Sequence, residues 1–242
     1  MRGAGVLTAA VVLVAVQCGG VDVATAETYR DGRDPTFLFF SGTDLWRDGG
    51  FLHGGLLWSP EGLDHEGLIF KAVVSGGAYR SGALAGAQVI GREFGVVVAP
   101  GWRFKRDTLE IKLFTGLELR NYRVSPDDPS SSLRGRYTGA HAAVELWYEP
   151  TPATMVAAHA SISSIGKSAS ARGAFGWRFL DLLYLGPEAQ TFACNDYRQY
   201  RLGVHATALK SDIVEWSGAI GWASDSDHRS SAYGRMGLVA RR

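Results

Sequence analysis

Apolar and polar residues alternate with a period of two over most of this chain. In the clearest stretch, apolar residues occupy the odd positions and charged residues the even ones: Leu109, Ile111, Leu113, Leu117 and Leu119 against Glu110, Lys112, Glu118 and Arg120. Successive side chains of a β-strand point to opposite faces, so this period is that of a strand and not of a helix. The alternation recurs at residues 140–148, 169–178 and 199–208.

Turn-forming stretches divide the chain at regular intervals. Eleven of them, from RDGG at 47–50 to SDSDHRSS at 224–231, are rich in Asp, Asn, Gly, Ser and Pro, which supply turn geometry. They predict twelve strands of about ten residues or more. No linker or shift in composition interrupts them, which predicts a single domain.

Regular strands of this kind form either a soluble sandwich or a barrel. Three features favour a membrane barrel: charged and His residues share the polar faces with many glycines, the strand number is even, and six of the seven tryptophans directly precede a turn. We therefore predict an all-β fold, an antiparallel up-and-down transmembrane β-barrel of about twelve strands. A soluble periplasmic β-sandwich that binds glucan is the alternative.

The barrel hypothesis assigns side chains to two places. Aromatic residues at strand ends predict interfacial belts, formed by Trp46, Trp58, Trp102, Trp177 and Trp222. Residues on the polar phase are candidates to line the lumen: Glu145, Trp147, Arg172, Arg178, Glu188, Arg201 and Glu215.

The N-terminus has the layout of a secretory signal. Arg2 precedes an apolar stretch from about Val6 to Val16, and an A-x-A site follows at Ala24–Ala26. We predict a cleaved signal peptide over residues 1–26 and one outer-membrane domain over 27–242. Lipidation of Cys18 is an alternative to cleavage after Ala26. If Cys18 leaves with the signal, Cys194 remains as a lone structural thiol.

Composition narrows the chemistry. The net charge of +1 and the pI of about 7.8 give no reason to expect nucleic-acid binding. The six histidines show no metal-ligand spacing, and the acidic pairs Asp127–Asp128 and Asp225/Asp227 lack a calcium-loop pattern, so we expect neither a metal nor a cofactor.

One pair resembles a catalytic motif. His159 and Ser161 are two residues apart, as in the lipid A deacylases of outer membranes, and on a strand they share one face. The Glu that those enzymes carry twelve residues after the Ser is Gly173 here. A lipid-modifying barrel enzyme is therefore the second alternative, and lumen-lining residues are the favoured interpretation.

Several long segments together resemble one family. FSGTDLWRDGGFLHGGLLWSPEGLDHEGLIFKAVVSGG, PGWRFKRDTLEIKLFTGLEL, YRVSPDDP, ELWYEPTPATM and GWASDSDHRSSAYGRMG are similar to the BcsS cellulose-biosynthesis proteins. The resemblance runs from about Phe39 to Arg242. The chain differs in one respect from outer-membrane barrels, which often end on an aromatic residue: its last residues are MGLVARR.

The resemblance implies an accessory role in making or secreting bacterial cellulose, without catalysis. The expected partners are outer-membrane lipid, cellulose or another β-glucan, and other cellulose-secretion components. Joined with the strand pattern, it implies a protein of the outer membrane that acts in export or surface retention of β-glucan. Periplasmic termini would place the longest charged connections, residues 125–135 and 224–231, outside the cell.

Overall fold

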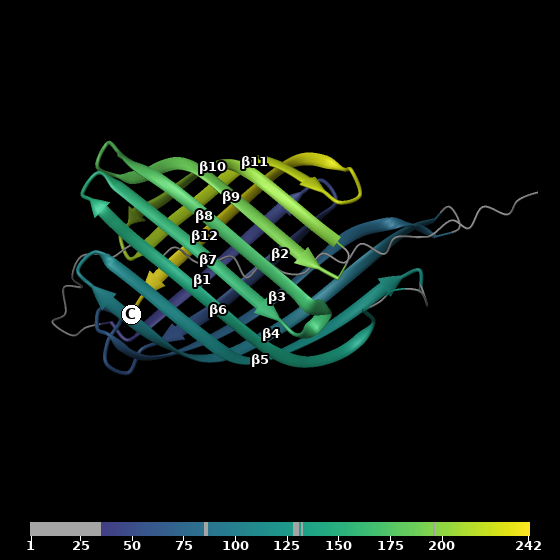
Figure 1. Ribbon diagram of the computed structural model, residues 1–242, viewed down its shortest axis with the longest axis horizontal. Helices are drawn as coiled ribbons and strands as arrows, with labels where there is room; N and C mark the ends of the chain where they lie inside the picture. The colour runs from purple at the N-terminus through teal and green to yellow at the C-terminus, as the bar shows by residue number, and fades with distance from the viewer. Residues whose placement is uncertain (1–34, 85–86, 128–130, 132, 196) are drawn as a thin grey trace, which may run out of the picture.

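The computed structural model describes residues 35–242 except 85–86, 128–130, 132 and 196, and the predicted signal peptide and Cys18 lie outside these residues. The described chain forms twelve strands and one short 3-10 helix (Figure 1). The elements are β1 (Phe37–Trp46), β2 (Gly49–Trp58), β3 (Gly67–Leu84), β4 (Ala87–Arg106), β5 (Leu109–Ser125), β6 (Gly135–Thr151), β7 (Thr154–Ser163), η1 (Ile165–Lys167), β8 (Ser168–Phe179), β9 (Leu183–Cys194), β10 (Tyr197–Ser211), β11 (Val214–Asp225) and β12 (Ser230–Arg241).

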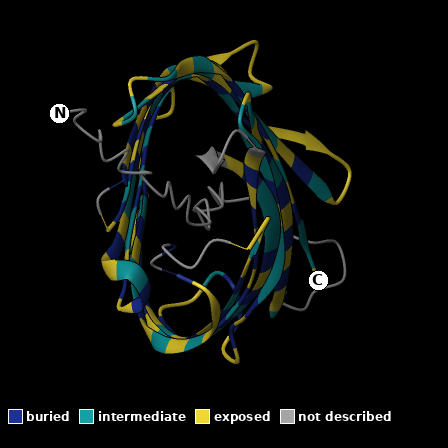
Figure 2. Ribbon diagram, turned by 90° about the vertical axis from the view of Figure 1, so that its right-hand side faces the viewer, coloured by how far each residue is buried: buried dark blue, intermediate teal, exposed yellow. Residues whose placement is uncertain are grey.

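Every strand pairs antiparallel with its neighbours in sequence, and β1 pairs with β12 to close the barrel. The closing register runs from Leu38 opposite Arg241 to Trp46 opposite Tyr233. In Figure 2, which is turned by 90° from the view of Figure 1, the cross-section of the barrel is elongated rather than round. The predicted up-and-down barrel of twelve strands is confirmed. The sandwich alternative is wrong, because a single sheet closes on itself.

The up-and-down topology sorts the connections between two ends. At one end of the barrel, here called the terminal end, β1 begins and β12 ends, and Phe37 and Arg242 exchange backbone hydrogen bonds there. The same end holds five of the connections between strands. Two of its hairpins turn at Asp107 and Asp212, both with positive φ, a conformation that Asp tolerates. The far end holds the other six connections, including the one between β5 and β6. The connection between β2 and β3, residues 59–66, is the long exception at the terminal end.

Side chains follow the predicted alternation, with large apolar residues outside and charged residues inside. Leu52, Leu117 and Leu202 are each at least 66% exposed on the outer surface, whereas Lys112, Glu118 and Arg201 are at most 3% exposed. The buried and exposed stripes that cross each strand in Figure 2 show the same pattern. A soluble core would reverse this arrangement, so the fold is of the outer-membrane type. Along the described part of the chain, no helix combines the length and apolar character needed to cross a membrane.

Glycines opposite aromatic residues make room on the inner wall. A Cβ at Gly91 would lie 2.3 Å from the Tyr79 ring, and one at Gly55 would lie 2.6 Å from the Phe40 ring. In both cases the glycine and the aromatic residue are direct cross-strand partners. The ring therefore lies flat over the backbone of the next strand, an arrangement that only glycine permits. This packing accounts for part of the high glycine content.

Candidate functional site: the polar lumen

Charged side chains fill much of the barrel interior, and their charges balance. Seven acidic and seven basic residues of the described chain are buried: Asp44, Glu93, Glu110, Glu118, Glu145, Glu188 and Glu215 with Lys71, Arg103, Lys112, Arg120, Arg172, Arg201 and Arg235. Burying a charge is costly unless it is paired. The balance indicates a paired network rather than a field that selects ions of one sign.

Among the ion pairs of the described residues, three bridge strands that are three positions apart in the barrel. Lys71 on β3 pairs with Glu145 on β6. Arg201 on β10 pairs with Asp44 on β1 at 2.7 Å, and Arg235 on β12 pairs with Glu188 on β9 at 2.9 Å. Because strands three positions apart do not touch each other directly, these pairs cross the interior and hold its walls together.

Glu188 is the most heavily contacted carboxylate among them. Its Oε2 accepts hydrogen bonds from Arg172 at 2.8 Å and from Arg235 at 2.9 Å. Its Oε1 accepts from the Tyr233 hydroxyl and from Gln190, each at 2.8 Å. The side chain is fully buried, so these donors replace the water that a free carboxylate would bind.

Another group of paired charges lies closer to the terminal end of the barrel. Lys112 lies 2.6 Å from Glu110 and 3.9 Å from Glu145, and Arg103 lies 3.3 Å from Glu110. Arg103 also donates to the carbonyl of Leu63, which belongs to the connection between β2 and β3. This contact ties the longest connection of the terminal end to the inner wall.

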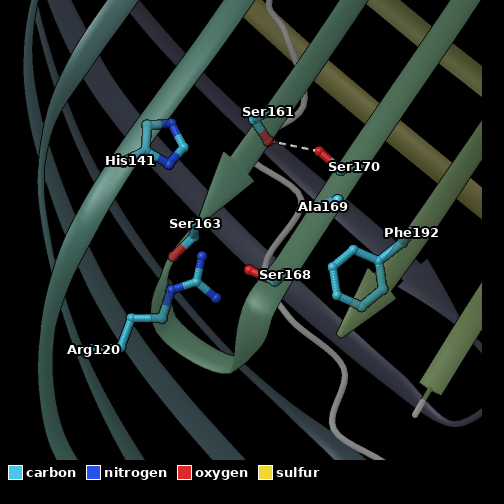
Figure 3. A pocket seen from close by; sticks show the side chains of 8 residues that line it. All are labelled: Arg120, His141, Ser161, Ser163, Ser168, Ala169, Ser170 and Phe192. Atoms are coloured by element: carbon cyan, nitrogen blue, oxygen red, sulfur yellow. Dashed lines mark hydrogen bonds between the residues drawn. The ribbon is translucent and has the colours of Figure 1, made fainter. Parts of the chain in front are cut away.

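A small polar pocket lies under the β7–β8 hairpin (Figure 3). Its lining includes four serine hydroxyls, from Ser161, Ser163, Ser168 and Ser170, beside His141 and Arg120. The Ser161 and Ser170 hydroxyls are 2.7 Å apart, Ser163 donates to Glu118, and Arg120 pairs with Glu93 at 2.7 Å. The cavity measures about 10 Å³. That is room for about one water molecule, so no glucan unit fits there.

A larger cavity of about 120 Å³ opens at the terminal end of the barrel. Its lining includes Glu149, Arg178, Asp181, Tyr184 and Lys210. The guanidinium of Arg178 lies 5.0 Å from the centre of the Tyr184 ring and donates to the Tyr184 hydroxyl at 2.6 Å. The aromatic face is thus already covered by an internal partner.

The seven residues assigned to the lumen from sequence have the following places. Six are buried inside: Glu145, Trp147, Arg172, Glu188, Arg201 and Glu215. Trp147 donates from Nε1 to Glu149 at 3.0 Å and meets Tyr184 edge to face, so its ring is packed rather than free to stack on a sugar. Arg178 is exposed at the terminal end of the barrel. The structure brings Arg172 and Glu188 into contact, while Glu145 and Arg201 belong to separate pairs.

The sequence assignment missed several members of the network. Asp44, Lys71, Glu93, Arg103 and Arg235 are as deeply buried as the chosen residues. All five lie on the inward phase of their strands, so the same alternation identifies them once the strand limits are known. Which of them meet across the barrel depends on closure, which the pattern of a single strand does not contain.

The tryptophans assigned to interfacial belts do not all face outward. Trp58, Trp102, Trp177 and Trp222 are 39–58% exposed on the outer surface. Trp46 is the correction: its ring stacks on Phe51 at 5.8 Å, and the Arg201 guanidinium lies 5.1 Å from its centre. Trp46 shares its strand phase with the buried Asp44, so the alternation directs it inward although it ends a strand. Trp216, which precedes no turn, is 39% exposed outside near the terminal end.

The His159 and Ser161 pair does not form a hydrogen-bonded dyad. Ser161 contacts Ser170, and the two ring nitrogens of the buried His159 have no hydrogen-bond partner. His159 lies opposite Glu145 on one neighbouring strand and opposite Arg172 on the other, inside the barrel.

The acidic loop pairs are held by arginines. Arg229 lies 3.3 Å from Asp225 and 2.8 Å from Asp227, and Arg134 lies 2.8 Å from Asp127, while Asp128 falls outside the described residues. Partial burial raises the pKa of the Asp227 carboxyl, although Arg229 opposes the shift. Within the described residues no group of three or more His, Cys, Asp or Glu side chains is placed to hold a metal ion. Cys194 is buried and unpaired with any cysteine of the described chain.

Several known structures align with this barrel at low sequence identity. The LpxR structure from Salmonella typhimurium aligns with a TM-score of 0.50 at 11% identity, covering 85% of this chain and 99% of that one. A KdgM porin in complex with disordered oligogalacturonate aligns at 0.49 and 14%, covering 84% and 98%. The translocator domain of the autotransporter NalP from Neisseria meningitidis aligns at 0.46 and 12%, covering 88% and 90%. The LpxR likeness shows the barrel fold alone.

No curated protein matches this sequence. A family model does match, and it covers residues 38–242, which is the barrel from the second residue of β1 to the C-terminus. The family is described as cellulose biosynthesis protein BcsS. The segments that resemble this family in the sequence therefore belong to one continuous match over the closed barrel, and the chain belongs to the BcsS family.

Proposed function

We propose that this barrel is a non-catalytic outer-membrane component of cellulose production that supports export or surface retention of the β-glucan. The observation that carries the proposal is the family match, which spans the barrel. The lumen supports the non-catalytic part, because its buried acids and bases are equal in number and largely engaged with each other. The β-glucan is uncharged, so a lumen that handled it would not need an excess of charge of either sign. The partners we propose are outer-membrane lipid, the β-glucan and other components of its secretion.

Deletion of the gene tests this role in a cellulose-producing strain. We expect cell-bound cellulose, measured by dye binding, to fall. The glucan in the medium separates the two forms of the role: it rises if the barrel retains the polymer and falls with the cell-bound fraction if the barrel assists export. The matched control is the deletion strain complemented with the wild-type gene. Unchanged amount and location of cellulose would contradict the proposal.

The lipid-modifying alternative predicts a different result for Ser161. In the proposed non-catalytic barrel, Ser161→Ala removes one hydroxyl contact to Ser170 and leaves His159 in place. We expect the variant to restore cellulose to the wild-type level in the deletion strain and to leave the acylation of lipid A unchanged by mass spectrometry. Altered lipid A acylation in the strain with the wild-type gene, lost in the Ser161→Ala strain, would instead establish the enzyme.

A further inference from the structure

Four neighbouring strands carry arginines on the outer surface near the far end. The strands are the four longest of the barrel, β3 to β6, with 17 to 20 residues each. Each of the four arginines is exposed and falls on the outward phase of its strand: Arg80, Arg92, Arg123 and Arg136. We call these four residues the arginine row.

The row lies at the edge of the lipid-facing band. On β4, outward positions from Phe94 to Phe104 are all apolar, and Arg92 is the next outward residue toward the far end. This stretch is eleven residues long, and a strand needs about 9–11 residues to cross the hydrocarbon core. On β5 the apolar outward run ends at Leu119, two outward positions before Arg123. The arginines are therefore at the level of lipid headgroups.

Sheet register places like charges side by side within the row. Arg92 and Arg123 are direct cross-strand partners of β4 and β5. Arg80 is diagonal to Arg92, because the direct partner of Arg92 on β3 is Ala78, and Arg136 is likewise diagonal to Arg123, because its partner on β5 is Asn121. Directly opposed like charges destabilise a sheet.

No internal acid relieves this repulsion within the described chain. None of its carboxylates forms an ion pair with a member of the arginine row, and the nearby Asp127 pairs with Arg134 instead. The lumen shows the opposite arrangement, since its acids and bases balance. An unbalanced, exposed row of this kind suits an anionic ligand from outside the chain.

We propose that the arginine row binds the phosphate groups of a lipid headgroup in the leaflet at the far end, with Arg92 and Arg123 as the central pair. Guanidinium groups bind phosphate oxygens in a two-pronged geometry, and two of them on adjacent strands can engage one phosphate or two neighbouring ones. The apolar residues below the row, Phe94 and Leu119, then contact the acyl chains of the same lipid. A diphosphorylated glycolipid has this combination of groups. The proposal does not depend on any role in cellulose production.

The chain offers a matched control on the other side of the barrel. Arg198 on β10 is also exposed at the far end, but its partner on β9 is Ala193, so it has no opposed arginine there. Arg198→Ala removes one arginine charge from the same end and leaves all four arginines of the row in place.

The test measures lipid binding to the purified, folded barrel in detergent by native mass spectrometry. The probes are diphosphorylated lipid A, the same lipid with both phosphates removed, and inorganic phosphate. We expect Arg92→Ala/Arg123→Ala to weaken binding of the diphosphorylated lipid at least about tenfold, because two charge-assisted contacts are lost. We expect Arg198→Ala to leave it unchanged, and the dephosphorylated lipid to bind the wild-type protein as weakly as the double variant binds the phosphorylated one.

Three outcomes would overturn the proposal. The first is equal binding of the diphosphorylated lipid by the wild-type protein and the folded double variant, with folding checked by heat-dependent gel mobility. The second is equal binding of the phosphorylated and dephosphorylated lipids. The third is displacement of the lipid by inorganic phosphate at equal concentration, which would indicate a site for free anions. If the double variant does not fold, Arg123→Gln alone is compared with Arg198→Gln by the same criteria.

Discussion

Replacing Glu188 by alanine is expected to destabilise the folded barrel by about 3–5 kcal/mol, the range for breaking a buried ion pair by removing one partner. Glu188 is the carboxylate shared by Arg172 and Arg235, and it also accepts from Tyr233 and Gln190. Its removal takes the common acceptor from two buried guanidinium groups on β8 and β12. The free energy of unfolding, from urea titration of the protein refolded in lipid vesicles, measures the effect.

A surface pair supplies the control for Glu188. Asp127 also pairs with an arginine, at 2.8 Å, but its side chain is 71% exposed. We expect Asp127→Ala to cost about 0–1 kcal/mol, as exposed ion pairs do. A cost below about 1 kcal/mol for Glu188→Ala as well would mean that the interior network does not hold the barrel together in the way its buried geometry indicates.

Placing an arginine in the middle of the lipid-facing band should have the next largest effect. Val98 lies near the centre of the apolar stretch from Phe94 to Phe104 and is 55% exposed. On a water-soluble surface Val98→Arg would change stability by roughly 0.5 kcal/mol or less. In a bilayer we expect it to cost about 2–4 kcal/mol, because the guanidinium would lie in hydrocarbon. The free energy of unfolding, from reversible folding into lipid vesicles monitored by tryptophan fluorescence, measures the effect.

The matched control for Val98 is Leu182→Arg. Leu182 has a similar exposure of 60% but lies in the turn between β8 and β9, beyond the strands. At that level the same substitution should cost about 0–1 kcal/mol. Equal costs at the two positions would contradict the placement of the band across β4. A large cost at Val98 alone would locate the membrane on the barrel independently of the aromatic residues.

The strand pattern contained most of the fold. Alternation at residues 109–120 and turn residues such as Asp107 and Asp212 act locally, within a few residues, so they can be recognised without tertiary contacts. The same local signal assigned Glu188 and Arg201 to the polar phase. It predicted twelve strands but not their unequal lengths, which set the arginine row apart from the rest of the barrel surface.

Trp46 shows where a rule about residue type fails. Its place at the end of β1 suggested the membrane interface, yet its strand phase directs it toward Arg201 and Phe51. In a strand the phase decides which side a side chain faces, and position along the strand decides only its depth. Both are needed to assign an aromatic belt, and for Trp46 the phase was the decisive one.

By itself the sequence determined the all-β architecture, the division of each strand into two faces and the membership of the BcsS family, because each is encoded in residue types at fixed spacing. Only the tertiary structure decided which charges meet. Lys71 and Glu145 are 74 residues apart in the chain, and Asp44 and Arg201 are 157 apart. Closure of β1 on β12 makes such residues face each other across one lumen. The register between β4 and β5 places Arg92 opposite Arg123 on the outer surface of the barrel. Pairing across a barrel depends on the positions of all twelve strands at once, so no local pattern specifies it.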